Sequence, residues 1–176
     1  MTVLTSIGIM NGASLDGIDL AILKTDGENI VELGATHSVP YSRDLKVFIR
    51  RAIKAALEGR DGAADIGKAA GEVTEAHVIA VAELLEKAGL KRTAINVIGF
   101  HGQTILHRPK RSPEMQGRTW QIGDGKTLAE ETRIDVVSDF RVNDIAEGGE
   151  GAPFLPVYLA ALVRRLERNH AVSVIN

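Results

Sequence analysis

The sequence has no cysteine and no marked excess of either charge, and its opening residues lack the pattern expected of a leader. Without cysteine, the 176-residue chain has no disulfides or thiolate metal sites, which fits a reducing compartment. With 21 basic and 23 acidic residues the net charge is -2, which disfavours nucleic acid and anionic membranes as partners. The opening residues, MTVLTSIGIM, have no basic flank and lead straight into a glycine turn, unlike a signal peptide or a membrane helix. We therefore expect a cytoplasmic protein.

Segments typical of strands and segments typical of helices alternate along the sequence, as in an α/β domain. Hydrophobic residues make up 44% of the chain, enough for one domain with a real core. Short runs rich in Ile, Leu and Val predict strands at Thr5–Met10, Ile18–Lys24, Ile30–Ser38, Ile95–Phe100, Thr119–Ile122 and Ile134–Ser138. The dipeptide Asp26-Gly27 predicts a hairpin between the second and third strands. The sequence thus predicts a mixed sheet that opens with an antiparallel three-stranded meander.

Helical spacing of apolar residues predicts two long helices after this meander. The first begins at the N-cap Ser42, ends at Gly59 and buries a face that includes Leu57. The second spans Ala63–Ala88 and contains Gly67 and Gly71. Because interior glycine costs about 1 kcal/mol relative to alanine, we expect these two glycines to pack closely against a neighbour. Later elements are predicted at 126–132 and 156–168 as helices and at 170–176 as a strand.

The first chemical motif is GIMNGASLDGIDLAIL, where a polar, glycine-containing turn joins two buried strands. Such a turn can present backbone N–H groups to a phosphate, with Ser14 as a further donor. Asp16 and Asp19 would repel phosphate unless a divalent cation lies between them. Neither the P-loop pattern nor GxGxxG occurs in the sequence. An ordinary hairpin turn that uses Gly and Asn for their dihedral angles explains the same residues.

Two further motifs each follow a predicted buried strand. IGFHGQTILHRP places His101, Gln103, Thr104 and His107 in or near a loop, where they could bind a polar ligand such as a sugar. Two histidines six residues apart with no adjacent carboxylate are a poor metal site. In VVSDFRVNDIAEGGEGAPFLP, Arg141 could clamp an acidic group, and the glycines could form a hinge or lead into a helix at Pro153. Structural roles for these residues remain open.

Together, MNGASLDGID, HGQTILHRP, TWQIGDG and DFRVNDIAEGGEGAP resemble, in sequence, order and spacing, the anhydro-N-acetylmuramic acid kinases, from about Ile7 to Asn176. The resemblance implies a bacterial cytoplasmic enzyme of peptidoglycan recycling. Such an enzyme opens its 1,6-anhydro-sugar with water while it transfers the γ-phosphate of ATP to the 6-oxygen. The implied fold is the sugar kinase/Hsp70/actin type, with two ribonuclease-H-like halves around a nucleotide cleft, often as a homodimer.

The resemblance also implies roles for individual residues. The metal ligands would be Asp16 and Asp19, holding Mg with the nucleotide. The substrate site for the anhydro-sugar would use His101, Gln103, Thr104 and Arg141. The ATP phosphate loop would comprise Gly12, Ala13, Ser14, Leu15, Asp16, Gly17, Ile18 and Asp19.

Family members are about twice this length, and their catalytic aspartate lies in an Asp-x-Gly-Pro-Gly-Asn motif that does not occur in this sequence. The resemblance therefore implies that residues 1–170 form the N-terminal ribonuclease-H-like domain, that 171–176 begin a second domain, and that no catalytic base is present. A C-terminal half is then an expected partner. Two other interpretations remain open: a complete, non-catalytic sugar- or nucleotide-binding module, and a different sugar kinase of the same superfold.

Overall fold

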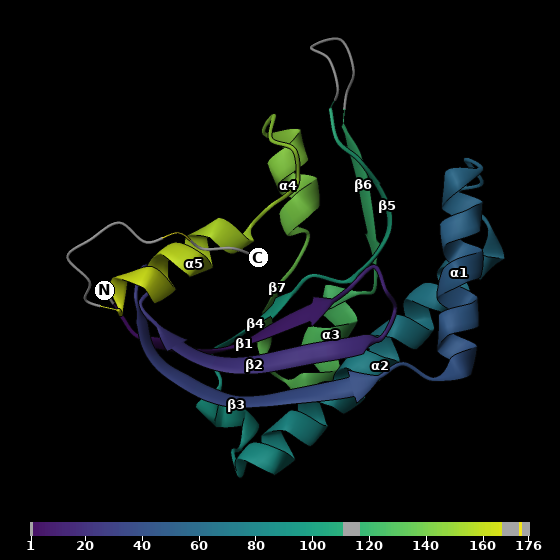
Figure 1. Ribbon diagram of the computed structural model, residues 1–176. Helices are drawn as coiled ribbons and strands as arrows, with labels where there is room; N and C mark the ends of the chain where they lie inside the picture. The colour runs from purple at the N-terminus through teal and green to yellow at the C-terminus, as the bar shows by residue number, and fades with distance from the viewer. Residues whose placement is uncertain (1, 111–116, 167–172, 174–176) are drawn as a thin grey trace.

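The computed structural model describes residues 2–110, 117–166 and 173. A five-stranded sheet of order β3-β2-β1-β4-β7 forms the centre of the fold, and β5 and β6 form a separate two-stranded ribbon (Figure 1). The strands are β1 Leu4–Asn11, β2 Gly17–Thr25, β3 Ile30–Pro40, β4 Val97–Phe100, β5 Gln103–Arg108, β6 Arg118–Ile122 and β7 Asp135–Val137. The α-helices are α1 Arg43–Leu57, α2 Ala64–Ala88, α3 Gly125–Thr132, α4 Phe140–Ala146 and α5 Leu155–Arg164. A 3-10 turn, η1, covers Arg92–Ala94.

The sheet is mixed, which confirms the predicted α/β class. β1, β2 and β3 pair antiparallel in chain order, whereas β4 is parallel to β1 and β7 is parallel to β4. The connection between β2 and β3 contains the predicted Asp26-Gly27, with Gly27 at a φ of 95°. The Asp26 carboxylate accepts hydrogen bonds from the backbone N–H groups of Glu28 and Asn29, so the acid closes the turn.

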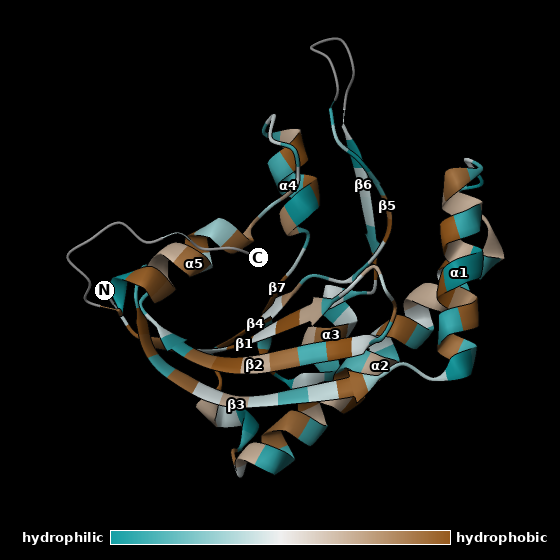
Figure 2. Ribbon diagram, in the orientation of Figure 1, coloured by the Kyte–Doolittle hydropathy of each residue, from teal (hydrophilic) through white to brown (hydrophobic). Residues whose placement is uncertain are grey.

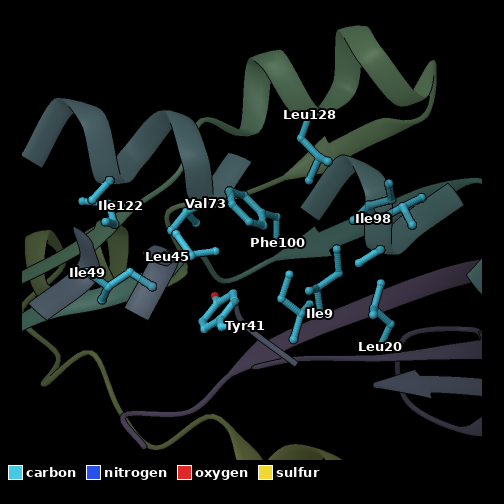
Figure 3. Packing of buried hydrophobic residues seen from close by; sticks show 14 of the residues in the cluster. Ile9, Leu20, Tyr41, Leu45, Ile49, Val73, Ile98, Phe100, Ile122 and Leu128 are labelled. Atoms are coloured by element: carbon cyan, nitrogen blue, oxygen red, sulfur yellow. The ribbon is translucent and has the colours of Figure 1, made fainter. Parts of the chain in front are cut away.

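The long helix α2 covers one face of the sheet, and α1 packs against α2 and β5. Ser42 caps α1 by accepting from the N–H of Leu45 at 3.1 Å, and Gly89 ends α2 in the left-handed conformation, at a φ of 64°. Figure 3 shows the core between these helices and the sheet, where Tyr41 lies among aliphatic and aromatic side chains. The inward residues of β2 alternate along the strand, as a one-sided sheet requires: Ile18, Leu20 and Ile22.

The opposite face of the sheet is only partly covered. A cavity there is lined by small and apolar residues of β1, β2 and β4, by Phe140 of α4 and by Tyr158 of α5. Hydrophobic residues recur along α5 (Figure 2), yet Val157 is 73% exposed and only Ala161 is buried in that helix. Among the described helices, none combines the length and apolarity needed to span a membrane.

Several predictions about local structure were wrong. Residues 103–108 form strand β5 rather than a loop, and residues 140–146 form the short helix α4. Gly67 and Gly71 do not pack closely, because a Cβ on either would meet no atom within 4 Å. Leu57 is 56% exposed rather than buried. The predicted strand at 170–176, apart from Ser173, and the predicted boundary between residues 170 and 171 lie outside the described residues.

Candidate nucleotide and sugar site

The three chemical motifs meet at one edge of the sheet. The turn after β1, the residues after β4 and the residues after β7 all follow the carboxyl ends of strands that are parallel and adjacent in the order β1-β4-β7. In α/β folds this edge is where ligands bind. The topology therefore brings together Gly12, His101 and Asp139 from segments that are far apart in the sequence.

The turn after β1 is held by an apolar side chain. Leu15 has a φ of 60°, and its side chain is buried in the core at 4% exposure. Its N–H donates to the Gly12 carbonyl at 3.2 Å, which closes the turn. Ala13 and Ser14 are consequently left exposed at the tip. Within the turn, the only residue with a positive φ is Leu15. The sequence had predicted that Gly12 and Gly17 would provide the positive φ angles.

Gly17 has a packing role rather than a ligand-facing one. A Cβ at this position would lie 2.2 Å from the carbonyl oxygen of Val39 on β3, so only glycine permits the close approach of the two strands. Ile18, the next residue, is buried in the core. Within the predicted phosphate loop, the exposed side chains therefore belong to Ala13, Ser14, Asp16 and Asp19.

Both predicted metal ligands are exposed acids. Asp19 lies on β2 and accepts a hydrogen bond from the Ser38 hydroxyl at 2.6 Å, while Asp16 precedes the strand. The N–H of Tyr41 donates to the Asp16 backbone carbonyl at 3.0 Å, which ties this end of the turn to the start of α1. Over residues 2–110, 117–166 and 173, no group of three or more His, Asp or Glu is placed to hold a metal ion. Any cation here would need further ligands from its nucleotide or from water.

His101 and Arg141 are in direct contact. The Arg141 Nε donates to His101 Nε2 at 2.9 Å, and His101 Nδ1 donates to the Gly102 carbonyl at 2.7 Å. Because Nδ1 carries the proton, Nε2 is free to accept. Burial, together with the positive charge of Arg141, lowers the pKa of His101, which keeps the ring neutral in this arrangement. Arg141 bonds through Nε alone, so its terminal nitrogens have no hydrogen-bond partner among the described residues.

Gln103 and Thr104 are neighbours in sequence but have different environments. Gln103 is fully buried, so its side chain does not face a ligand site, although the sequence predicted that it would. Thr104 is half-buried, and its hydroxyl accepts from the Gln121 side chain at 3.1 Å. The amide oxygen of Gln121 is buried without a partner among the described residues. Sequence reasoning noted the motif TWQIGDG but did not single out Gln121, which the pairing of β5 with β6 places opposite Thr104.

The other predicted polar residue, His107, lies on β5 and bonds to the Thr119 hydroxyl at 3.2 Å. His101 bonds to Arg141 instead, so the two histidines have separate partners. Two buried polar residues had no local signal in the sequence: Tyr41 and His77. They form a cluster with Gln103 and with Asn11, which belongs to the first motif.

Known proteins resemble the chain over almost its entire length. A family model described as anhydro-N-acetylmuramic acid kinase matches residues 4–176. The anhydro-N-acetylmuramic acid kinase of Nitrobacter winogradskyi is 43% identical over 178 residues, covering 98% of this chain and 47% of the relative. That of Agrobacterium fabrum is 47% identical over 165 residues, covering 92% of this chain and 43% of the relative. The chain thus spans about half the length of the curated relatives it matches. With the family match over nearly every residue, this chain belongs to the anhydro-N-acetylmuramic acid kinase family.

Proposed function

We propose that this chain is the amino-terminal half of an ATP-dependent anhydro-N-acetylmuramic acid kinase. The observation that carries the proposal is the meeting of three motifs at the carboxyl ends of β1, β4 and β7. In the proposed reaction, water opens the 1,6-anhydro ring and the γ-phosphoryl group of ATP is transferred to the 6-oxygen. Phosphoryl transfer depends mainly on positioning and charge stabilisation, and backbone and polar groups at such an edge supply both.

At this edge of the sheet, the turn at residues 12–16 would meet the nucleotide phosphates through its exposed tip, with Ser14 as a hydroxyl donor. Asp16 and Asp19 are the carboxylates that could hold a magnesium ion bound to the nucleotide. The ion, when bound, would neutralise charge on the phosphates. Carboxylate oxygens are ligands that suit magnesium, and both side chains are exposed as such a role requires.

The sugar would lie nearer the β4 and β7 ends of this edge. Arg141, oriented through its Nε by His101, could offer its terminal nitrogens to an acidic group of the substrate. Thr104 is accessible, and the unpartnered amide oxygen of Gln121 next to it could accept a hydrogen bond from a sugar hydroxyl. The proposed general base, which activates the water, is not among these residues and would come from the remaining length found in the relatives.

The architecture that fits this function is a ribonuclease-H-like half of the sugar kinase/Hsp70/actin superfold. The mixed sheet with three antiparallel strands followed by parallel ones supports that assignment. A second half would form the other wall of the cleft, and we include it as the main protein partner. A homodimer and a cytoplasmic location belong to the same proposal, and both rest on the family resemblance.

Titration of this chain with Mg-ATP, followed by backbone NMR, tests the nucleotide part of the proposal. We expect the amide resonances of residues 12–19 to shift, and the Asp16→Asn and Asp19→Asn variants to bind more weakly while melting within a few degrees of the unmodified chain. Asp135→Asn is the matched control, because Asp135 is an exposed acid at the start of β7, away from the ligand edge. The assignment of Asp16 and Asp19 to the metal–nucleotide site would be wrong if all three substitutions had the same effect on Mg-ATP binding. It would also be wrong if substituting Asp16 and Asp19 changed only the stability of the chain.

A further inference from the structure

Four polar side chains form a continuous cluster beneath the turn that follows β1. Asn11 ends β1, Tyr41 precedes α1, His77 lies in the middle of α2 and Gln103 begins β5. None is more than 6% exposed. Apolar groups surround them, and the His77 ring meets Phe100 edge-on at 5.0 Å between ring centres. A buried polar group without a partner costs about 1–3 kcal/mol, so the bonds within this cluster matter to the fold.

The hydrogen bonds run outward from the Asn11 side-chain amide, toward His77 on one side and toward Tyr41 and Gln103 on the other. His77 Nδ1 lies 2.6 Å from the Val73 carbonyl, which can only accept, so Nδ1 carries the proton and Nε2 accepts from the Asn11 side-chain amide at 2.9 Å. The same amide nitrogen donates to the Tyr41 hydroxyl. That hydroxyl donates in turn to Gln103 Oε1 at 3.2 Å. Each member therefore has a defined role as donor or acceptor.

The cluster ends on the turn itself. Gln103 Nε2 has two hydrogens and two carbonyls to receive them: Gly12 at 3.5 Å and Thr104 at 3.3 Å. One buried amide thus bridges the first residue of the β1–β2 turn and the first residues of β5. The Gly12 carbonyl also accepts from the N–H of Leu15, so the two bonds together fix its orientation. Gln103 is consequently joined to both segments of the ligand edge without being exposed to a ligand.

We propose that Gln103 and Tyr41 are positioning residues, which hold the β1–β2 turn in the shape that binds nucleotide phosphates and keep it in register with Thr104. Neither side chain contacts a ligand. This inference rests on the proposed function and deepens it, because it assigns to buried side chains the geometry of the phosphate-binding turn. Pre-ordering a binding loop raises affinity since less ordering is required when the ligand arrives.

The test uses Tyr41→Phe, which deletes one hydroxyl, and Gln103→Met, which keeps the length of the side chain. Tyr158→Phe is the matched control, as this tyrosine lies on α5, against the opposite face of the sheet. Backbone hydrogen exchange of residues 12–16 is measured without ligand, and Mg-ATP affinity is measured separately. Losing one hydrogen bond corresponds to about a tenfold effect, so we expect turn exchange to rise by about that factor and affinity to fall similarly in both variants.

The effects of the two substitutions on turn exchange should not add in the double variant, because each substitution interrupts the same series of hydrogen bonds. Unchanged turn exchange in both variants would overturn the proposal. So would weak binding in Gln103→Met with full affinity in Tyr41→Phe, which indicates direct contact by Gln103. If Gln103→Met does not fold, the Tyr41→Phe result decides alone. The unmodified chain could also fail to bind Mg-ATP while both variants show faster exchange in the turn. That result would support the positioning role and overturn the nucleotide assignment.

Discussion

The burial of His77 predicts a specific acid sensitivity. Burial lowers the pKa of its imidazole from 6.5 to about 4, an effect partly offset by the bond to the Val73 carbonyl and increased by nearby His101. The unfolded chain therefore binds more protons than the folded chain between these two values, so stability rises with pH in that range. The contribution is fully present above about pH 6.5 and is lost as the pH falls through about 4.

The magnitude follows from the two pKa values. One pKa unit corresponds to 1.36 kcal/mol, so the step from 6.5 to about 4 corresponds to a loss of about 3 kcal/mol. Denaturant unfolding of the unmodified chain and of His77→Gln, at pH values from 7.5 to 4, isolates the contribution of His77 to the unfolding free energy. The carboxylates are common to both proteins, so their titration cancels in the difference. The difference in unfolding free energy between them should shrink by about that amount. Parallel stability curves would refute the reasoning.

Three further outcomes follow from the same geometry. In a protein that joins this chain to the remaining half of a longer relative, Arg141→Ala and Thr104→Ala should raise the sugar KM while Mg-ATP affinity stays unchanged; equal losses of both affinities would indicate general damage. Gly17→Ala should destabilise the chain by about 1–3 kcal/mol through its clash with Val39, whereas Gly67→Ala should stabilise it by about 0.5–1 kcal/mol, as thermal melts can show. The partly covered sheet face should bind a hydrophobic dye and promote self-association, and sedimentation showing a monomer that binds no dye would contradict this.

Local sequence signals were sufficient for the elements that bury one regular face. The alternation in β2, the Ser42 cap of α1 and the left-handed Gly89 after α2 each have a mechanism that operates within a few residues. β5 was missed because it begins next to a glycine and carries polar residues on both faces, including a buried glutamine. α4 was missed because its N-cap, Asp139, has a left-handed conformation, at a φ of 62°, and makes no side-chain cap bond.

The candidate site was harder to predict in its details. The order of the motifs indicated which segments would meet, and the parallel strands β1, β4 and β7 bring them to one edge. The burial of Gln103 depends on Asn11, Tyr41 and His77, which come from three other segments of the chain, so no local pattern could reveal it. Similarly, the need for glycine at position 17 arises from β3 rather than from a phosphate.

The most direct test of the account is an assay of sugar-dependent ADP release with anhydro-N-acetylmuramic acid and ATP. It is run on this chain, on the separately expressed carboxyl-terminal half of a longer relative, and on the two mixed together. Because positioning and charge stabilisation are proposed to come from both walls of the cleft, the account predicts turnover only in the mixture. Robust sugar-dependent turnover by the 176-residue chain alone would contradict it.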